Sequence, residues 1–461
     1  MVHIKISKGL TIPIQGHPEG EIKPLIPSGQ AYSSAPAQYS LNLKKFETIK
    51  FRLLVKPGDA VKIGQPLAED KEVPGRMFVS PAAGTIKEIR RGLKRSLHDI
   101  VIDASQDSFH EFPQINPSSA SKEELIQRLL EGGCFTFIHS RPFNLLADPK
   151  KLPKSLFIKA IESAPFVPPA EMQVLGLETE FAAGLKALIK IAEAPVHLVY
   201  RKGTSCKAFT DAVGVQHHTA EGPHPIANAS LHIQEIDPIR SPEDVIWTLT
   251  AYDVAAIGHL LTKGRCLLER VVSIAGPGIL YGHTGFFKVR NGTPISHFIS
   301  GRIQKGNLRF ISGDPLMGKK TGPEDFLGFN DTAFTVIPEN VEREFLHFMG
   351  LGADKYSFSK AYLSGHLDNK KKEYAFTTNQ HGEHRPFIDS SLYDKVMPLK
   401  VPTMLLVKAV MAEDFDLAET LGLLEVDSED FALPTFVCPS KMEMTEIIKT
   451  GLNQYAKEVI S

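Results

Sequence analysis

The chain has 461 residues, which at roughly 150 residues per domain predicts about three folding units rather than one. Its 52 Lys and Arg residues nearly balance its 53 Asp and Glu residues, so the formal net charge is −1 and no overall field draws the protein to nucleic acid. With 42% hydrophobic and 23% charged residues, the composition is that of a folded globular protein and excludes a disordered chain.

Residues 1–112 are predicted to form a β-rich domain that resembles the barrel-sandwich hybrid of biotinyl and lipoyl carriers. Turn glycines at Gly58 and Gly64 bracket short alternating strands, and the pattern repeats over 80–86. Lys71 lies near the place of the modified lysine of such carriers. The segment from Lys71 to Pro81 is longer than the carrier pattern, so an unmodified turn is the favoured prediction.

Residues 113–255 are predicted to form a Rossmann-like α/β domain, because helices and strands alternate from about residue 120. Ser121 and Glu124 form a capping box for the first helix, and Gly132-Gly133 ends it. Strands are expected at 135–139, 156–161 and 196–200, and further helices at 178–194 and after Ser241-Pro242.

Residues 256–325 are predicted to form a β-grasp domain of the SLBB-like type, with strands at 270–278 and 286–289 and a short helix from Pro294. Residues 326–461 have a mixed pattern that becomes helical. Helices are expected at 413–424 and after Ser440, with Glu443 three residues on.

Three motifs suggest ligand sites and are better explained as local structure. The segment 313–320 nearly matches a phosphate-binding loop but has Lys320 where Ser or Thr would bind the metal, so we expect a surface turn. Gly276-x-Gly278 precedes a strand instead of the helix that a dinucleotide site requires. His217-His218 matches no known metal spacing, which favours a structured loop.

The four cysteines are too few and too scattered for the disulfide framework of a secreted domain, and no two form a C-x-x-C pair. We therefore expect a reducing compartment and no metal or cluster held by a local cysteine run. The first residues lack a secretory signal pattern, and the longest apolar runs are far shorter than the roughly 20 residues that span a bilayer. The chain is expected to cross no membrane.

A basic cluster lies in the second half of the β-rich domain and is a candidate docking patch for an acidic partner or lipid headgroups. A solvated face is the default interpretation. The cluster, opposed only by Glu88, consists of Lys87, Arg90, Arg91, Lys94 and Arg95.

Short stretches along nearly the whole chain, taken in order, resemble the A subunit of the bacterial sodium-translocating NADH:quinone oxidoreductase. They include Arg141-Pro142-Phe143 and Gly222-Pro223-His224-Pro225. The remaining stretches lie at 6–10, 69–71, 81–84, 91–95, 270–277, 311–313, 365–367, 396–399 and 435–439. The domain order is also similar to that of the C subunit of the Rnf complex and, more remotely, of the flavoprotein subunit of respiratory complex I.

Those relatives bind FMN and NADH through a glycine-rich loop, and this sequence departs from their pattern. The equivalent stretch, 131–137, keeps Gly132 and Gly133 and replaces the later glycines with bulky residues, so the backbone cannot approach a phosphate closely. The iron–sulfur run of the relatives survives only as Cys438-Pro439, and one thiolate cannot hold a cluster. The region 326–461 is therefore interpreted as a degenerate iron–sulfur domain, and no cofactor is expected in this chain.

The resemblance implies a subunit of a complex that passes electrons from NADH to ubiquinone and exports Na+, with the flavins and iron–sulfur centres in partner subunits. The chain is then expected on the cytoplasmic side of the bacterial inner membrane, held there by integral-membrane subunits. Two roles stay open. It acts as a redox-silent scaffold, or it helps to form the quinone site, for which Arg141, Phe143 and His224 have suitable chemistry.

An unrelated alternative also stays open. The same α/β layer supports a stand-alone flavin- or nucleotide-dependent oxidoreductase. A flavin absorption band in the purified chain would favour this alternative.

Overall fold

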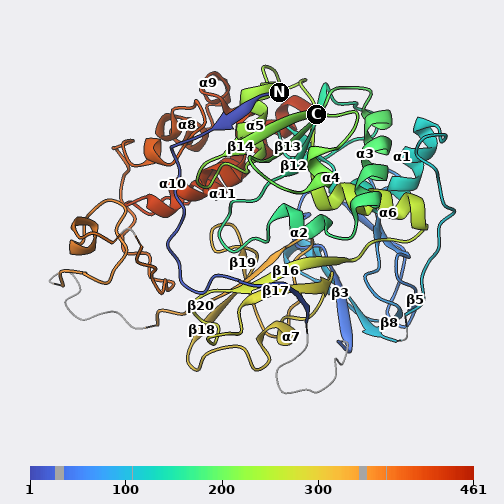
Figure 1. Ribbon diagram of the computed structural model, residues 1–461, viewed down its shortest axis with the longest axis horizontal. Helices are drawn as coiled ribbons and strands as arrows, with labels where there is room; N and C mark the ends of the chain where they lie inside the picture. Colours follow the sequence, from blue (N-terminus) through green and yellow to red (C-terminus); the bar gives the residue numbers. More distant parts are fainter. Residues whose placement is uncertain (26–35, 106, 342–349, 370, 461) are drawn as a thin grey trace.

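The computed structural model describes residues 1–25, 36–105, 107–341, 350–369 and 371–460. Figure 1 shows that the chain forms four regions that lie next to one another. The α/β layer lies at the top, a β-grasp domain below it, the barrel-sandwich hybrid on the right, and the C-terminal helices behind and to the left. This arrangement confirms the predicted multidomain α/β class.

The barrel-sandwich hybrid consists of two small antiparallel sheets around an apolar core. Ile86, Ile100 and Ile102 point into this core and are nearly inaccessible to solvent. One sheet has the order β3 (Gln38–Asn42), β9 (Leu97–Ala104), β8 (Gly84–Arg91) and β5 (Ala60–Val61), and the other has β4 (Phe51–Leu53), β6 (Pro66–Asp70) and β7 (Met77–Val79).

The α/β layer is built on a mostly parallel seven-stranded sheet. At one edge of the sheet, β10 pairs antiparallel with both β15 and β11. The order is β1 (His3–Lys5), β14 (Gln216–Glu221), β13 (Val196–Arg201), β12 (Ser155–Ala160), β15 (Ile246–Thr250), β10 (His139–Arg141) and β11 (Leu145–Leu146).

Both faces of this sheet are buried. On β12, Leu156 and Ile158 face one core and Phe157 faces the other, as the twofold alternation of a strand requires. The first core contains α1 (Lys122–Glu131), α3 (Glu178–Ala192), α6 (Ala251–Lys263) and the short helices α2 (Ala170–Val174) and α4 (Lys207–Thr210). The second contains α5 (Ala229–Ile236), α8 (Thr403–Met411), α9 (Phe415–Thr420), α10 (Ala432–Val437) and α11 (Met444–Ile460).

The β-grasp domain contains a six-stranded sheet with helix α7 (Ile295–Ile299) packed on it. The strand order is β19 (Lys319–Thr321), β18 (Leu308–Ser312), β20 (Ala333–Pro338), β16 (Glu269–Ala275), β17 (Gly285–Arg290) and β2 (Ile22–Pro24). Residues 313–318 form the turn between β18 and β19, as the failed phosphate-loop match predicts.

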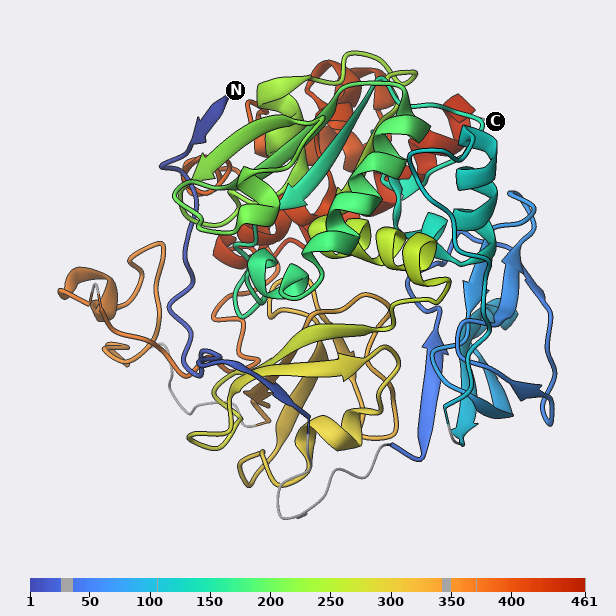
Figure 2. The same ribbon diagram turned by 45° about the vertical axis from the view of Figure 1, so that its right-hand side comes forward.

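The N-terminal segment joins two domains. β1 extends the α/β sheet by pairing with β14, and β2 extends the β-grasp sheet by pairing with β17. Figure 2 shows this segment, in dark blue, running down the side of the molecule from one sheet to the other. The first 24 residues therefore lie outside the two sheets of the barrel-sandwich hybrid.

Helix α1 follows the sequence expectation, because the Ser121 hydroxyl accepts the amide hydrogen of Glu124. Three local predictions are wrong. The strand expected at 135–139 is a 3₁₀ turn, η2 (Cys134–Phe137), because Gly133 turns the chain and the Thr136 hydroxyl donates to its carbonyl. No helix begins at Ser241, since Asp244 accepts from the Arg240 amide and Lys154 and holds a turn. His217-His218 lies on strand β14 instead of a loop.

Candidate functional site

The three quinone-pocket candidates all lie at the boundary between the α/β sheet and the C-terminal helices. Arg141 ends β10, Phe143 follows it, and His224 comes just after β14. Their exposed fractions are 2%, 6% and 7%, and the Phe143 ring meets the Tyr455 ring edge-on at 6.0 Å. The structure brings the three residues to one boundary and covers them with protein.

Arg141 belongs to a buried polar network. Its Nη1 donates to the Ser230 hydroxyl at 2.8 Å, and Ser230 also hydrogen-bonds Asp430. The carboxylate of Asp430 accepts from the Asn228 amide at 2.8 Å. Arg141 Nη2 has no hydrogen-bond partner among the described residues. The guanidinium charge acts on Asp430 through space and favours its ionised form.

The carboxylates come from the turn 427–430, which the sequence analysis did not select. Burial raises the pKa of Glu429 to about 8 and also raises the pKa of Asp430, with Asp427 adding repulsion at Glu429. The available signal is Asp427 followed three residues later by Asp430, which form a capping box on helix η7 (Ser428–Phe431). A capping pattern alone does not show that a guanidinium from another domain lies nearby.

His224 is held as a neutral imidazole. Burial, followed by the positive charge of Lys159, lowers its pKa to about 4. Its Nδ1 is hydrogen-bonded at 3.0 Å to the Ser163 hydroxyl, which also accepts the amide hydrogen of Ala227. His224 is thus a hydrogen-bonded imidazole inside the layer.

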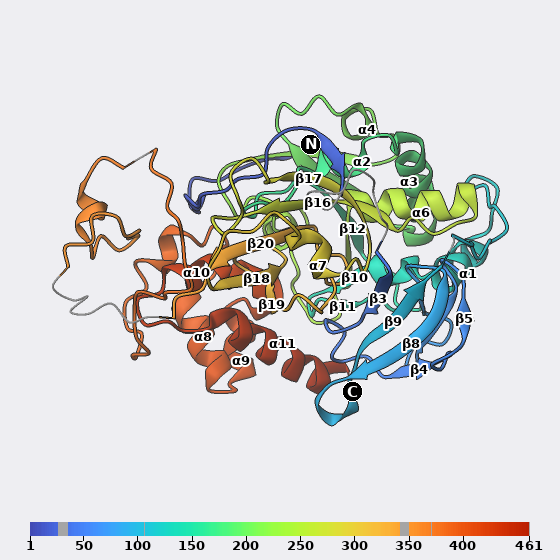
Figure 3. The same cartoon turned by 90° about the horizontal axis from the view of Figure 1, so that it is seen from below.

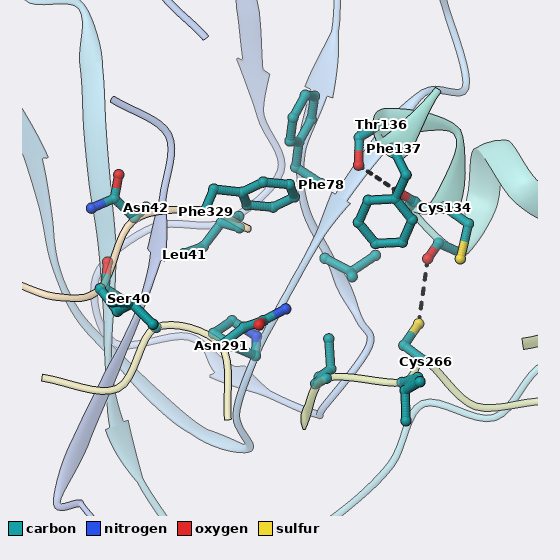
Figure 4. Close-up of a pocket in the computed structure, with 18 residues that line it drawn as sticks. Ser40, Leu41, Asn42, Phe78, Cys134, Thr136, Phe137, Cys266, Asn291 and Phe329 are labelled. Atoms are coloured by element: carbon teal, nitrogen blue, oxygen red, sulfur yellow. Dashed lines mark hydrogen bonds between the residues drawn. The ribbon is translucent and has the colours of Figure 1, made fainter. Parts of the chain in front are cut away.

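Gly132 and Gly133, from the stretch that the sequence analysis compared with a glycine-rich loop, line the small space shown in Figure 4. Phe78, Phe137 and Phe329 surround it, with Cys134 and Cys266 toward the other end. Its volume is about 40 Å³, against roughly 300–1,000 Å³ for a ligand pocket. The residues present do not fit a flavin.

The two thiols beside this cavity are unreactive. Cys266 Sγ donates to the carbonyl of Gly132 at 3.4 Å. Burial raises the pKa of Cys266 to about 12 and raises that of Cys134 as well. Both groups stay protonated thiols at neutral pH and serve as small apolar side chains.

Cys438, which the sequence analysis interpreted as the remainder of an iron–sulfur run, is fully buried and has a structural role. Its Sγ lies 3.2 Å from the Tyr393 hydroxyl and accepts the Met442 amide hydrogen at 3.5 Å. Among the described residues, no group of three His, Cys, Asp or Glu side chains could hold a metal ion. The donor set around Cys438 does not fit a cluster.

The basic cluster lies on β8 and the tip of the β8–β9 hairpin. Arg90 is engaged, since its Nε bonds Glu88 at 2.8 Å and its guanidinium lies over the Phe326 ring. Lys87, Arg91, Lys94 and Arg95 are exposed, and Leu93 between them is 91% exposed. Figure 3 shows this hairpin extending beyond its neighbours.

Three models of known protein domains match this chain, and together they extend from residue 4 to residue 322. Residues 4–105 match the NqrA N-terminal barrel-sandwich hybrid domain, residues 120–266 the NqrA second alpha/beta domain, and residues 271–322 the NQRA C-terminal domain. The corresponding Na(+)-translocating NADH-quinone reductase subunit of Chlamydia pneumoniae is 36% identical over 463 residues, covering 99% of this chain and 98% of the relative. The chain belongs to the NqrA family of Na+-translocating NADH-quinone reductase subunits.

Other members of the NqrA family match over the same length. The protein of Chlamydia caviae is 37% identical, covering 99% of this chain and 97% of its own, and that of Saccharophagus degradans is 34% identical, covering 99% and 100%. This full-length similarity confirms the family resemblance found in the sequence.

A solved NAD+-reducing [NiFe]-hydrogenase in the H2-reduced state superposes with a TM-score of 0.37 and 12% identity, covering 74% of this chain and 62% of that chain. A superposition at this level supports no statement about the NqrA family.

In this member of the family, no helix among the described residues is long and apolar enough to span a bilayer. Arg141, Phe143 and His224 line neither the cavity of Figure 4 nor the larger cleft at the C-terminal region. Their assignment to a quinone pocket stays a prediction, as does the assignment of the exposed basic hairpin to partner docking.

Proposed function

We propose that this chain is a subunit of a Na+-translocating NADH:quinone oxidoreductase that holds no redox group itself and positions the subunits that do. The observation that carries the proposal is the full-length match to the NqrA family combined with the 40 Å³ cavity at the former cofactor loop. NADH, flavins, iron–sulfur centres and ubiquinone then belong to the complex and are bound by partner subunits.

The proposed attachment is through the basic hairpin, on the cytoplasmic side of the inner membrane. Arg91, Lys94 and Arg95 are exposed and flank an exposed apolar residue, Leu93, at the tip, and the exposed Lys87 lies on strand β8. Charge gives orientation and a fast encounter with an acidic partner, and the leucine adds apolar contact area. Arg90 is assigned to the junction with the β-grasp domain, because it also donates to the Glu324 carbonyl.

For Arg141, Phe143 and His224 we propose a positioning role instead of direct quinone contact. All three are satisfied or enclosed by groups of the α/β sheet and the C-terminal helices. They support the scaffold by fixing these two parts relative to each other. Labelling by a photoreactive quinone at these residues would contradict this assignment.

Co-purification tests the docking proposal. The variant Arg91→Glu/Lys94→Glu/Arg95→Glu, placed in the tagged full chain, is expected to reduce recovery of the membrane subunits from detergent-solubilised membranes at least severalfold. The control, Lys56→Glu/Lys62→Glu/Lys71→Glu, changes charge by the same amount at exposed sites of the same domain. Equal recovery with both variants would contradict the proposal.

A further inference from the structure

Helix α8 is apolar on every side and is nevertheless partly exposed. Lys408 is the one charged residue in its sequence, TMLLVKAVM. A helix that is apolar all round is ordinarily buried all round, because no side of it interacts favourably with water. Leu406 and Val410 are buried in the second core, but Leu405 and Met411 on the outer side each keep an exposed fraction of 52%. The outer side of α8 therefore has the composition of a covered surface.

Helix α9 extends this surface. It follows α8 after a short turn, and Leu417 on its outer side is 46% exposed. Figures 1 and 3 show the two helices side by side at the edge of the molecule. The Lys408 ammonium is engaged by this chain's own Phe387 ring, whose centroid lies 5.2 Å away. The α8–α9 face is formed by the exposed side chains of Leu405, Met411 and Leu417.

Acidic side chains lie beside the α8–α9 face. Glu413 and Asp414 are exposed in the turn between the two helices, and Asp416 is exposed in the first turn of α9. The stretch 409–440 contains eight Asp or Glu residues and no Lys, Arg or His. The local field over the face is therefore negative and attracts cationic groups.

This combination of exposed apolar and acidic side chains selects one kind of partner. Anionic lipid headgroups and acidic protein surfaces are repelled by the carboxylates. An uncharged apolar partner would bury the carboxylates without compensation, which costs free energy. A segment that carries both apolar and Lys or Arg side chains covers the leucines and also pairs the carboxylates.

We propose that the α8–α9 face docks a cationic amphipathic segment of a partner subunit, with apolar contacts at Leu405, Met411 and Leu417 and Lys or Arg side chains beside Glu413 and Asp416. This surface has the opposite charge to the basic hairpin and takes a different partner segment. Figure 1 places α8 and α9 at the upper left and β8 at the lower right, so both surfaces can be occupied at once. The inference does not depend on the role of the hairpin.

The α8–α9 face is preformed, because α11 fixes both helices from beneath. Tyr455 of α11 stacks on Phe415 of α9, with ring centroids 5.4 Å apart and ring planes 14° apart. Gly451 of α11 allows α8 to approach closely, since a Cβ there would lie 2.3 Å from Val410 Cγ1. A fixed platform loses little conformational entropy when a partner binds.

Thiol accessibility tests the proposal. Leu405→Cys and Leu417→Cys place single reactive thiols on the face, and Leu175→Cys at the end of α2, where the side chain is 69% exposed, is the matched control. A Cys206→Ser background removes the half-buried native thiol, since the other three cysteines are buried. The rate of modification by a maleimide is measured in the full chain alone and in the complex solubilised in detergent.

We expect modification of Leu405→Cys and Leu417→Cys to be slower by about tenfold or more in the complex than in the full chain alone, because the partner segment excludes solvent. The rate at Leu175→Cys should not change. Unchanged rates on assembly at the two face positions, or equal slowing at all three positions, would overturn the proposal.

Charge reversal tests the chemistry of the partner. Glu413→Lys/Asp416→Lys should remove most of the protection of Leu405→Cys in the complex, whereas Glu19→Lys/Glu21→Lys, an equal charge change at exposed sites elsewhere, should leave it intact. The thermal midpoint of the full chain checks that both charge variants are folded. Equal protection in the two charge variants would contradict a cationic partner.

Cross-linking from a photoreactive phenylalanine analogue at position 405 identifies the occupant. We expect a peptide of one partner subunit in which Lys or Arg residues stand next to apolar ones. An acidic or uncharged peptide would overturn the proposal. So would a peptide from a second copy of this chain, since that result would make the face a self-association surface.

Discussion

At the scale of single residues, the motifs shared with the family have become parts of a buried polar layer. Arg141, at the end of β10, meets Ser230 on α5 and the carboxylates of the 427–430 turn, so one guanidinium connects three segments far apart in sequence. Removing one member of a buried charge pair strongly destabilises a protein, because the other charge is left buried without a partner.

Arg141→Met is therefore expected to lower the free energy of unfolding by about 3 kcal/mol or more, because the buried carboxylate of Asp430 loses its compensating charge. Urea unfolding at pH 7 measures the loss. Adding Asp430→Asn should recover part of it, giving a coupling energy of about 1 kcal/mol or more. The control is Arg385→Met, at an exposed arginine, which should cost less than about 0.5 kcal/mol. Additive losses from Arg141 and Asp430 would contradict the network.

His224 makes stability depend on pH. Its pKa is about 4 in the folded chain and about 6.5 when unfolded, so the unfolded chain binds the proton first as the pH falls. The stability from this residue is complete above about pH 6.5 and is lost progressively as the pH falls toward 4.

Between pH 7 and pH 5 the loss from His224 amounts to about 2 kcal/mol. His224→Asn, whose Oδ1 can still accept from Ser163, should make the free energy of unfolding less dependent on pH by that amount. Urea titrations of both proteins at the two pH values measure the difference. Parallel pH profiles would show that His224 takes up its proton without cost in the folded state.

At the scale of elements, the strand pairing of the N-terminal segment could not be predicted from its own sequence. Strands β1 and β2 have three residues each, too few for alternation to show, and each pairs with a strand more than 200 residues away. Helix α1 and strands β12, β13, β16 and β17 were predictable, because their caps and apolar patterns are local.

The candidate sites were less predictable for the same physical reason. The basic hairpin is contiguous and could be found by its charge alone. The larger cleft at the C-terminal region is lined by Ile12, Pro315, Tyr356 and Phe436, which no sequence spacing connects. Gly132 and Gly133 could be singled out from the sequence, but the side chains that fill the space beside them, such as Phe78 and Phe329, come from other domains.

The crossing of the N-terminal segment over the loop at 222–225 requires glycine. Gly9 has φ +134°, and a Cβ there would lie 2.2 Å from the His224 carbonyl oxygen, which accepts the Leu10 amide hydrogen at 2.8 Å. Gly20 also has positive φ, +89°, but a Cβ there would meet nothing within 4 Å.

Gly9→Ala should therefore destabilise the protein by about 1–3 kcal/mol more than Gly20→Ala, the difference being overpacking against backbone. Both variants carry the strain of alanine at positive φ, so the pair isolates the contact. Thermal unfolding and hydrogen exchange of the β14 amides measure the effect. Equal midpoints for the two variants would show that the segment is free to move away from the loop.

At the scale of the whole molecule, the domains are tied by specific polar contacts as well as by the threaded N-terminal segment. Gln173 of the α/β layer donates to the Val271 carbonyl at 2.8 Å and accepts its amide hydrogen at 3.1 Å. β20 pairs with β16 only from Ser273 onward, so Gln173 supplies the partner that this end of the strand lacks. Arg290 makes a bidentate pair with Asp107 at 2.9 Å and joins the β-grasp domain to the barrel-sandwich hybrid side.

Gln173→Leu tests whether this side-chain contact couples the α/β layer to the β-grasp domain. It leaves one buried backbone donor and one acceptor unpaired, which should lower the free energy of unfolding by about 2–4 kcal/mol. Gln127→Leu, on the exposed face of α1, is the matched control and should change it by less than about 0.5 kcal/mol. Because the lost bonds join two domains, the β17 and β18 amides should also exchange hydrogen before those of β12 and β13 in the variant. One cooperative transition at the original midpoint would show instead that the threaded N-terminal segment alone keeps the two domains together.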